Sequence, residues 1–250
     1  MRLRDLSGLL RHPGLASDLV AYWRSARTAG TRMPTLRRLR FLAEATADTP
    51  FDSHYVYHTA WATRILQANP PPVHIDVSSS LYFVALASAI VPIEHYDYRP
   101  PDLVLPNVKL GHADLVALPF ADHAIASLSC MHVVEHIGLG RYGDPVDALG
   151  DAKARAELSR VLAPGGQLLF VVPVGRPAVI FNAHRIYAFD DVVAGFPDLV
   201  LEHFSLITDS RDGRQLIFDA DPARVAKQKF GCGCFVFRRP VSLNGQKAPT

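Results

Sequence analysis

The sequence predicts an α/β protein built on a doubly wound, mostly parallel sheet, which a helical segment precedes in the chain. From Val73 onward, short apolar runs alternate with helical patterns, as they do in βαβ units. Residues 125–172 contain five segments in order: an apolar run, a polar segment, a helical stretch, a Gly-Gly turn and a second apolar run. This order predicts two parallel strands with a pocket at their carboxyl ends.

The residues before this sheet are predicted to be helical. Apolar residues recur at helical spacing around 15–23 and again around 36–42. A third helix is expected over about 54–68, because Asp52-Ser53 offers an N-cap. The prolines that follow Asn69 then break the chain. The predicted divisions are a helical cap or extension (1–69), the sheet domain (70–240) and a flexible tail (241–250).

Seven strands and two helices are expected in the sheet domain. Each predicted strand is a short run rich in apolar residues. The predicted strands are 73–77, 91–98, 108–110, 125–130, 167–172, 199–208 and 232–239. The predicted helices are 82–89 and 151–162.

Composition excludes several classes of protein. The formal net charge is +2, and 20% of residues are charged, so no nucleic-acid partner is expected. No apolar stretch reaches the ~18 residues of a membrane span, and no signal peptide is evident at the start. The three cysteines do not suggest a disulfide framework, and the spacing of Cys232 and Cys234 is not that of a zinc knuckle. We therefore expect a soluble cytoplasmic protein, whose N-terminal helices offer a surface for a homodimer.

Five stretches of sequence resemble the class I S-adenosylmethionine-dependent methyltransferases, and within them a poorly characterised bacterial methyltransferase-like family of unknown function. The stretches are HIDVSSS (74–80), SLSCMHVVEHIGLGRYGDP (127–145), RVLAPGGQLLFVVPVG (160–175), FNAHR (181–185) and GCGCFVF (231–237). The resemblance implies a Rossmann-like sheet of seven strands, mostly parallel with the last strand antiparallel. It also implies that S-adenosylmethionine is the cofactor.

The resemblance assigns a set of cofactor-binding residues. An acidic residue and a glycine-rich turn usually follow the first strand, and here serines stand where glycines are usual. A carboxylate at the end of the second strand suits the ribose hydroxyls, because it accepts two hydrogen bonds. The implied residues are Asp76, Ser78, Ser79 and Ser80 after the first strand, Asp97 for the ribose, and Asp114 and Leu115 for the adenine.

The segment HVVEH (132–136) has three interpretations. It formally matches a reversed zinc-protease motif, but that motif needs a helix, whereas His132 follows an apolar strand. Related methyltransferases place a divalent ion near this point, and the resemblance then offers His132, Glu135, His136 and His184 as metal ligands. In the third interpretation, the segment orients the substrate or holds nearby loops by hydrogen bonds.

Loops after the fourth and fifth strands are expected to bind the acceptor, because they lie above the carboxyl ends of the sheet. The candidate substrate-binding residues are Arg141, Tyr142, Arg176, Asn182 and Arg185.

The predicted reaction is methyl transfer to a hydroxyl of a small acceptor, such as a sugar or nucleotide sugar in polysaccharide or glycoconjugate biosynthesis. His136 and His184 are the candidate general bases, since an imidazole titrates near neutral pH, and Glu135 would orient one of them. The serines of the glycine-rich turn favour an alternative: a methyltransferase-like binding or scaffold protein that has lost cofactor binding.

Overall fold

A computed structural model describes residues 14–32, 47, 49–209 and 213–241. The chain divides into two compact units, Met1–Pro50 and Phe51–Thr250. In the first unit the structure describes helix α2 (Gly14–Ala29), where the helical spacing around 15–23 predicted one. The helix expected over 36–42 lies outside the described residues, as do residues 242–250 of the predicted tail.

The second unit alternates strands and helices, as expected. Its helices are α3 (Ser53–Ala68), α4 (Leu81–Ala87), α5 (Gly150–Val161) and α6 (Phe189–Ala194), with short 3-10 turns η2 (Val134–His136) and η4 (Pro222–Lys227). The strands are β1 (His74–Val77), β2 (Ile93–Asp97), β3 (Val108–His112), β4 (Ile125–Met131), β5 (Leu162–Val174), β6 (Ala178–Ile180), β7 (His184–Ile186), β8 (Val200–Ile207), β9 (Leu216–Ile217) and β10 (Gly231–Arg238).

The main sheet has eight strands, in the order β3-β2-β1-β4-β5-β10-β8-β9. The strands from β3 to β5 pair in parallel, and β10 is antiparallel to both β5 and β8. The prediction of a mostly parallel sheet is confirmed. The predicted number of seven strands was one short, because β9 pairs with the end of β8. A separate hairpin, β6-β7, forms where a rim loop was expected.

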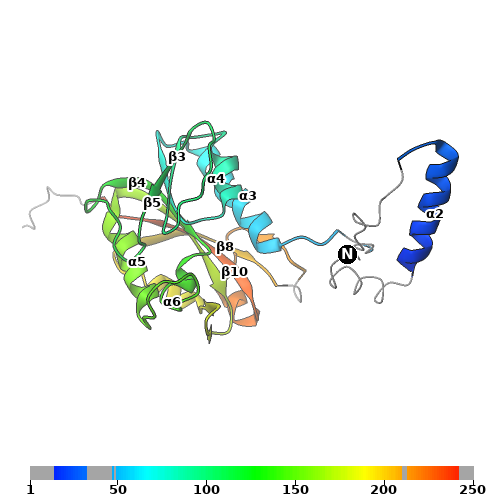
Figure 1. Cartoon of the computed structure of the whole chain (residues 1–250). Helices are drawn as coiled ribbons and strands as arrows, with labels where there is room; N and C mark the ends of the chain where they lie inside the picture. Colours follow the sequence, from blue (N-terminus) through cyan, green and yellow to red (C-terminus); the bar gives the residue numbers. More distant parts are fainter. Residues whose placement is uncertain (1–13, 33–46, 48, 210–212, 242–250) are drawn as a thin grey trace, which may run out of the picture. The chain divides into compact units, whose positions relative to one another are not determined.

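Helices cover both faces of this sheet, with α3 and α4 on one face and α5 and α6 on the other (Figure 1). Side chains of a strand alternate between faces. In β5, Phe170 and Val172 therefore belong to the core beneath α5 and α6, whereas Leu169 and Val171 belong to the core beneath α3 and α4. This burial on both sides explains why the second half of β5, Leu168 to Val174, is continuously apolar.

Helix α3 belongs to the sheet unit and not to the N-terminal segment. Its residues Trp61, Ala62 and Leu66 are buried in the same core as Phe83 of α4. The boundary between the compact units accordingly follows Pro50, whereas the sequence placed it at residue 69. Asp52 caps the helix as predicted, since its carboxylate accepts a hydrogen bond from the backbone N–H of Tyr55 at 3.2 Å.

The junction between α5 and β5 is tighter than predicted. The helix ends at Val161 and the strand begins at Leu162. Pro164, Gly165 and Gly166 therefore lie among the first residues of the strand and not before it. No helix in the described parts of the chain is long and apolar enough to span a membrane.

Candidate functional site

Polar side chains gather at the carboxyl ends of the parallel strands. Ser78 follows β1, Asp97 ends β2 and His132 follows β4. Because the carboxyl ends of parallel strands meet at one edge of a sheet, these residues lie around a common region. Two cavities open there, with volumes of about 330 and about 660 Å³.

The smaller cavity contains four of the seven residues predicted to bind the cofactor: Ser78, Asp97, Asp114 and Leu115. In Asp97, Oδ1 accepts a hydrogen bond from the backbone N–H of Arg99 at 2.7 Å. No hydrogen bond from the described residues reaches its Oδ2, which leaves this oxygen available to a ligand. The chemistry of this wall, a carboxylate beside apolar side chains, fits a ribose and a purine ring.

Ser78 has the backbone conformation that explains why glycine is usual at its position. Its φ is +57°, in the left-handed region that is uncommon for residues other than glycine. Its backbone N–H donates to the carbonyl of Tyr96 at 2.8 Å, which fixes the turn between β1 and α4. The serine thus retains the turn geometry of a glycine.

The other three residues predicted to bind the cofactor have structural roles, and none of them lines the smaller cavity. Asp76 is fully buried and accepts hydrogen bonds from His95 Nδ1 at 2.7 Å, from the Ser129 hydroxyl and from the Ser79 N–H. Burial opposes ionisation of Asp76, but these hydrogen bonds prevail and lower its pKa. Ser80 caps α4 by accepting from the Tyr82 N–H at 3.3 Å.

His74 belongs to the same buried network, and its burial leads us to expect that the protein loses stability in acid. Its ring nitrogens bond to the hydroxyls of Ser127 and Ser129 at 2.7 and 2.9 Å, and burial lowers its pKa from 6.5 to about 4. Between pH 6.5 and 4, His74 is therefore protonated in the unfolded chain but neutral in the folded chain. The free energy of unfolding should fall by up to about 3 kcal/mol from this group as the pH drops from 6.5 to 4.

Urea unfolding across this pH range would measure the effect. His74→Gln keeps hydrogen-bonding atoms and removes the titrating group, so its stability should fall less steeply with acid than that of the wild type. Equal slopes for the two proteins would contradict the role given to His74.

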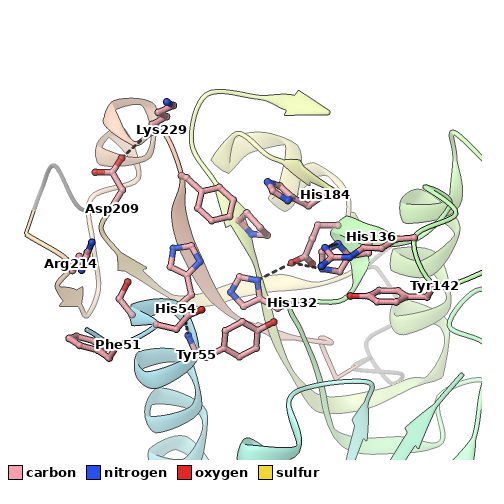
Figure 2. Close-up of a pocket in the computed structure, with 16 residues that line it drawn as sticks. Phe51, His54, Tyr55, His132, His136, Tyr142, His184, Asp209, Arg214 and Lys229 are labelled. Atoms are coloured by element: carbon pink, nitrogen blue, oxygen red, sulfur yellow. Dashed lines mark hydrogen bonds and ion pairs between the residues drawn. The ribbon is translucent and has the colours of Figure 1, made fainter. Parts of the chain in front are cut away.

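The larger cavity is built from distant parts of the chain (Figure 2). In the figure His54 and His132 lie next to each other, and His136 and Tyr142 lie beyond His132. The lining residues are Phe51, Asp52, Ser53, His54, Tyr55, His132, Glu135, His136, Arg141, Tyr142, Pro173, His184, Asp209, Arg214, Lys229 and Phe230.

Glu135 lies buried at the centre of the histidines. Its Oε1 accepts a hydrogen bond from His132 Nδ1 at 2.9 Å and lies 3.7 Å from His136 Nε2. Its Oε2 is buried without a hydrogen-bond partner. Burial raises the pKa of Glu135 to about 7. The carboxyl group is thus placed to hold His132 and to interact with His136.

His136 is the candidate base with the more suitable position. Its Nδ1 bonds to the carbonyl of Ala183 at 2.6 Å. A carbonyl only accepts hydrogen bonds, so the tautomer that satisfies this contact carries its proton on Nδ1 and keeps a lone pair on Nε2. Arg141 Nη1 lies 3.1 Å from Nδ1 and donates to the same carbonyl at 3.0 Å. Burial lowers the pKa of His136, which favours this neutral form. His136 also lines both cavities, together with His132 and Tyr142, whereas His184 lines the larger of the two.

The predicted substrate-binding residues divide into two groups. Arg141 and Tyr142 line the larger cavity. Arg176 and Asn182 are exposed, and neither lines either cavity. Arg185 is buried away from both cavities and donates a hydrogen bond to the carbonyl of Ile137 at 2.7 Å. Arg185 therefore fixes the 3-10 turn and its loop.

The four residues predicted to bind a metal do not form one ligand set. Among the described residues, the group with ligand atoms mutually within 4.8 Å is His54, His132 and Cys232. Only His132 was in the predicted set. The sequence analysis missed His54 and Tyr55, although both follow directly after the Asp52-Ser53 cap. Two histidines one helical turn apart, His54 and His58, were the available signal.

Comparisons with known proteins support the fold. A family model described as "Caenorhabditis protein of unknown function, DUF268" matches residues 120–205. No curated protein matches the chain. Solved structures are similar at low sequence identity.

One such structure is the N-methyltransferase NodS of Bradyrhizobium japonicum in complex with S-adenosyl-L-homocysteine, with 13% identity and a TM-score of 0.53; the match covers 78% of this chain and 94% of NodS. Another is a Bacillus halodurans protein provisionally assigned as a methyltransferase, with 14% identity and a TM-score of 0.53; this match covers 73% of this chain and 99% of that protein. At these identities the similarity concerns the fold.

Proposed function

Because the chain has the fold of the class I S-adenosylmethionine-dependent methyltransferases, we propose that it transfers a methyl group from S-adenosylmethionine to a hydroxyl of a small acceptor. A sugar or nucleotide sugar of glycoconjugate biosynthesis is the favoured class. The main observation in support is that two cavities adjoin and share His132, His136 and Tyr142. The smaller cavity would hold the cofactor and the larger one the acceptor.

Residues of the smaller cavity fit the cofactor. The free Oδ2 of Asp97 would accept a hydrogen bond from the ribose, and Leu115, which is buried, would pack against the adenine beside Asp114. Bound S-adenosylmethionine supplies an electrophilic methyl group on a sulfonium centre. The task of the protein is then mainly to position the acceptor in line with that methyl group.

The larger cavity fits a hydroxylated acceptor that carries an anionic group. His136 Nε2 would take the proton of the attacking hydroxyl, because His136 lines both cavities and its Nδ1 is held by the Ala183 carbonyl. Tyr55 and Phe230 line this cavity, stacked on His132 and His54, and supply aromatic rings for contact with a sugar or a base. Arg214 and Lys229 line the cavity as well, together with the carboxylates of Asp52 and Asp209, and the two cations would pair with a phosphate or carboxylate of the acceptor.

Calorimetric titration with S-adenosylhomocysteine would test the cofactor site directly. We expect saturable binding of one molecule per chain, followed by methyl transfer from radiolabelled S-adenosylmethionine to a member of a panel of sugars and nucleotide sugars. Absence of binding at millimolar ligand would refute the proposal and favour the binding or scaffold protein.

Asp97→Ala is expected to weaken the binding of S-adenosylhomocysteine by at least about tenfold, since a hydrogen bond to a charged group contributes about 1.5–3 kcal/mol. Glu94→Ala is the matched control, because Glu94 lies on the same strand, has the same charge and lines neither cavity. If both variants bound as tightly as the wild type, Asp97 would have no part in the cofactor site.

A further inference from the structure

Three side chains of types that can bind a metal ion lie close together beside Glu135. His54 comes from the first turn of α3, His132 directly follows β4, and Cys232 lies in β10. One ligand atom of each lies within 4.8 Å of the others, and Cys232 Sγ lies 3.3 Å from His132 Nε2. Secondary-structure elements thus fix all three residues at one point, which favours a built site over a chance encounter.

The two nitrogens of His132 have different partners. Nδ1 bonds to the carboxylate of Glu135, and Nε2 lies against Cys232 Sγ. A metal-binding histidine typically donates its second N–H to a carboxylate or a backbone carbonyl, which fixes the tautomer and the direction of the ring. The hydrogen bond of His132 to Glu135 has this pattern.

We propose that His54, His132 and Cys232 bind one divalent ion of the zinc class. Imidazole and thiolate together are preferred ligands of Zn²⁺. On binding, the S–H bond of Cys232 breaks, an S–Zn bond forms and the proton passes to solvent. Glu135 holds His132 in place and is not itself a ligand.

The proposed ion has three protein ligands and an open fourth position. His54 and His132 both line the larger cavity, so an oxygen atom of a molecule bound in that cavity would be the candidate for the fourth position. Three protein ligands with one open position are typical of catalytic zinc sites. That this oxygen is the hydroxyl of the acceptor is an inference that rests on the proposed function.

Metal content and cobalt spectroscopy test the site without any need for enzymatic activity. The full chain is loaded with Zn²⁺, dialysed and analysed for metal, and we expect about one zinc ion per chain. Replacement of zinc by Co²⁺ should give the near-ultraviolet absorption band of a thiolate bound to cobalt. A wild-type protein that retains no zinc would overturn the proposal.

Variants separate this site from other arrangements. Cys232→Ala and His54→Ala should each lose the zinc, and Cys232→Ala should also lose the cobalt band. Cys130→Ala should keep both, since Cys130 is an equally buried free cysteine in the core on the opposite face of the sheet. His184→Ala should also keep the zinc, and loss of zinc there would favour the ligand set predicted from sequence.

Titration with S-adenosylhomocysteine and far-ultraviolet circular dichroism report on each variant's fold. A folded Cys232→Ala variant that keeps its zinc would overturn the proposal. Because cofactor binding is measured separately, a wild type that binds S-adenosylhomocysteine but no metal would refute the zinc site and leave the proposed function intact.

Discussion

Replacement of His136 with asparagine is expected to lower kcat for methyl transfer by about 10²- to 10⁴-fold, the range for loss of a positioned general base. Asparagine was chosen because its amide N–H can replace Nδ1–H in the hydrogen bond to the Ala183 carbonyl. The variant then keeps this hydrogen bond but lacks Nε2, and with it the basic lone pair. Single-turnover kinetics with the acceptor found in the panel would measure the effect.

His184→Asn provides the matched control. His184 lines the larger cavity but not the smaller one, so its replacement should affect acceptor binding more than the rate of transfer. Both variants should bind S-adenosylhomocysteine with wild-type affinity within a few-fold. A His136→Asn variant with full kcat would exclude His136 as the base.

Gly138→Ala is expected to destabilise the protein by about 3 kcal/mol or more, because two unfavourable effects add. Gly138 has a φ of +78°, which an alanine adopts only with strain, and an added Cβ would lie 2.0 Å from the carbonyl oxygen of Asp147. Asp147 cannot simply move away, because its own N–H donates to the Gly138 carbonyl at 2.9 Å. Urea unfolding would measure the loss.

Gly143→Ala separates the two effects. Gly143 has a φ of +85°, but an added Cβ would meet nothing within 4 Å, so about 1 kcal/mol is expected. Since Gly138 lines the smaller cavity, Gly138→Ala should also weaken binding of S-adenosylhomocysteine. Equal stabilities of the two variants would show that the loop relaxes around the new methyl group.

Strands β4 and β5 could be predicted because most of their residues are buried on both faces and form largely apolar runs. Strand β9 has only two residues, too few to produce such a pattern. The place of α3 was mispredicted for a different reason. Helical spacing reveals that Trp61 and Leu66 share an apolar face, but it does not reveal what that face packs against.

The cofactor residues were assigned through the resemblance, which places acidic residues at or just after the ends of strands. Asp97 and Asp114 fill such positions, and both line the same cavity. Asp76 follows the same rule in sequence, yet its carboxylate is taken up by His95 and Ser129 of the neighbouring strands. Such cross-strand partners depend on register, which the order of residues does not display.

The wall shared by the two cavities has a thermodynamic consequence. Any movement of His132, His136 or Tyr142 on binding in one cavity alters the other, and such coupling is reciprocal. An acceptor that tightens the binding of S-adenosylhomocysteine must itself bind more tightly in its presence, by the same factor. The acceptor can therefore be sought among compounds that raise the melting temperature of the S-adenosylhomocysteine complex more than that of the free protein.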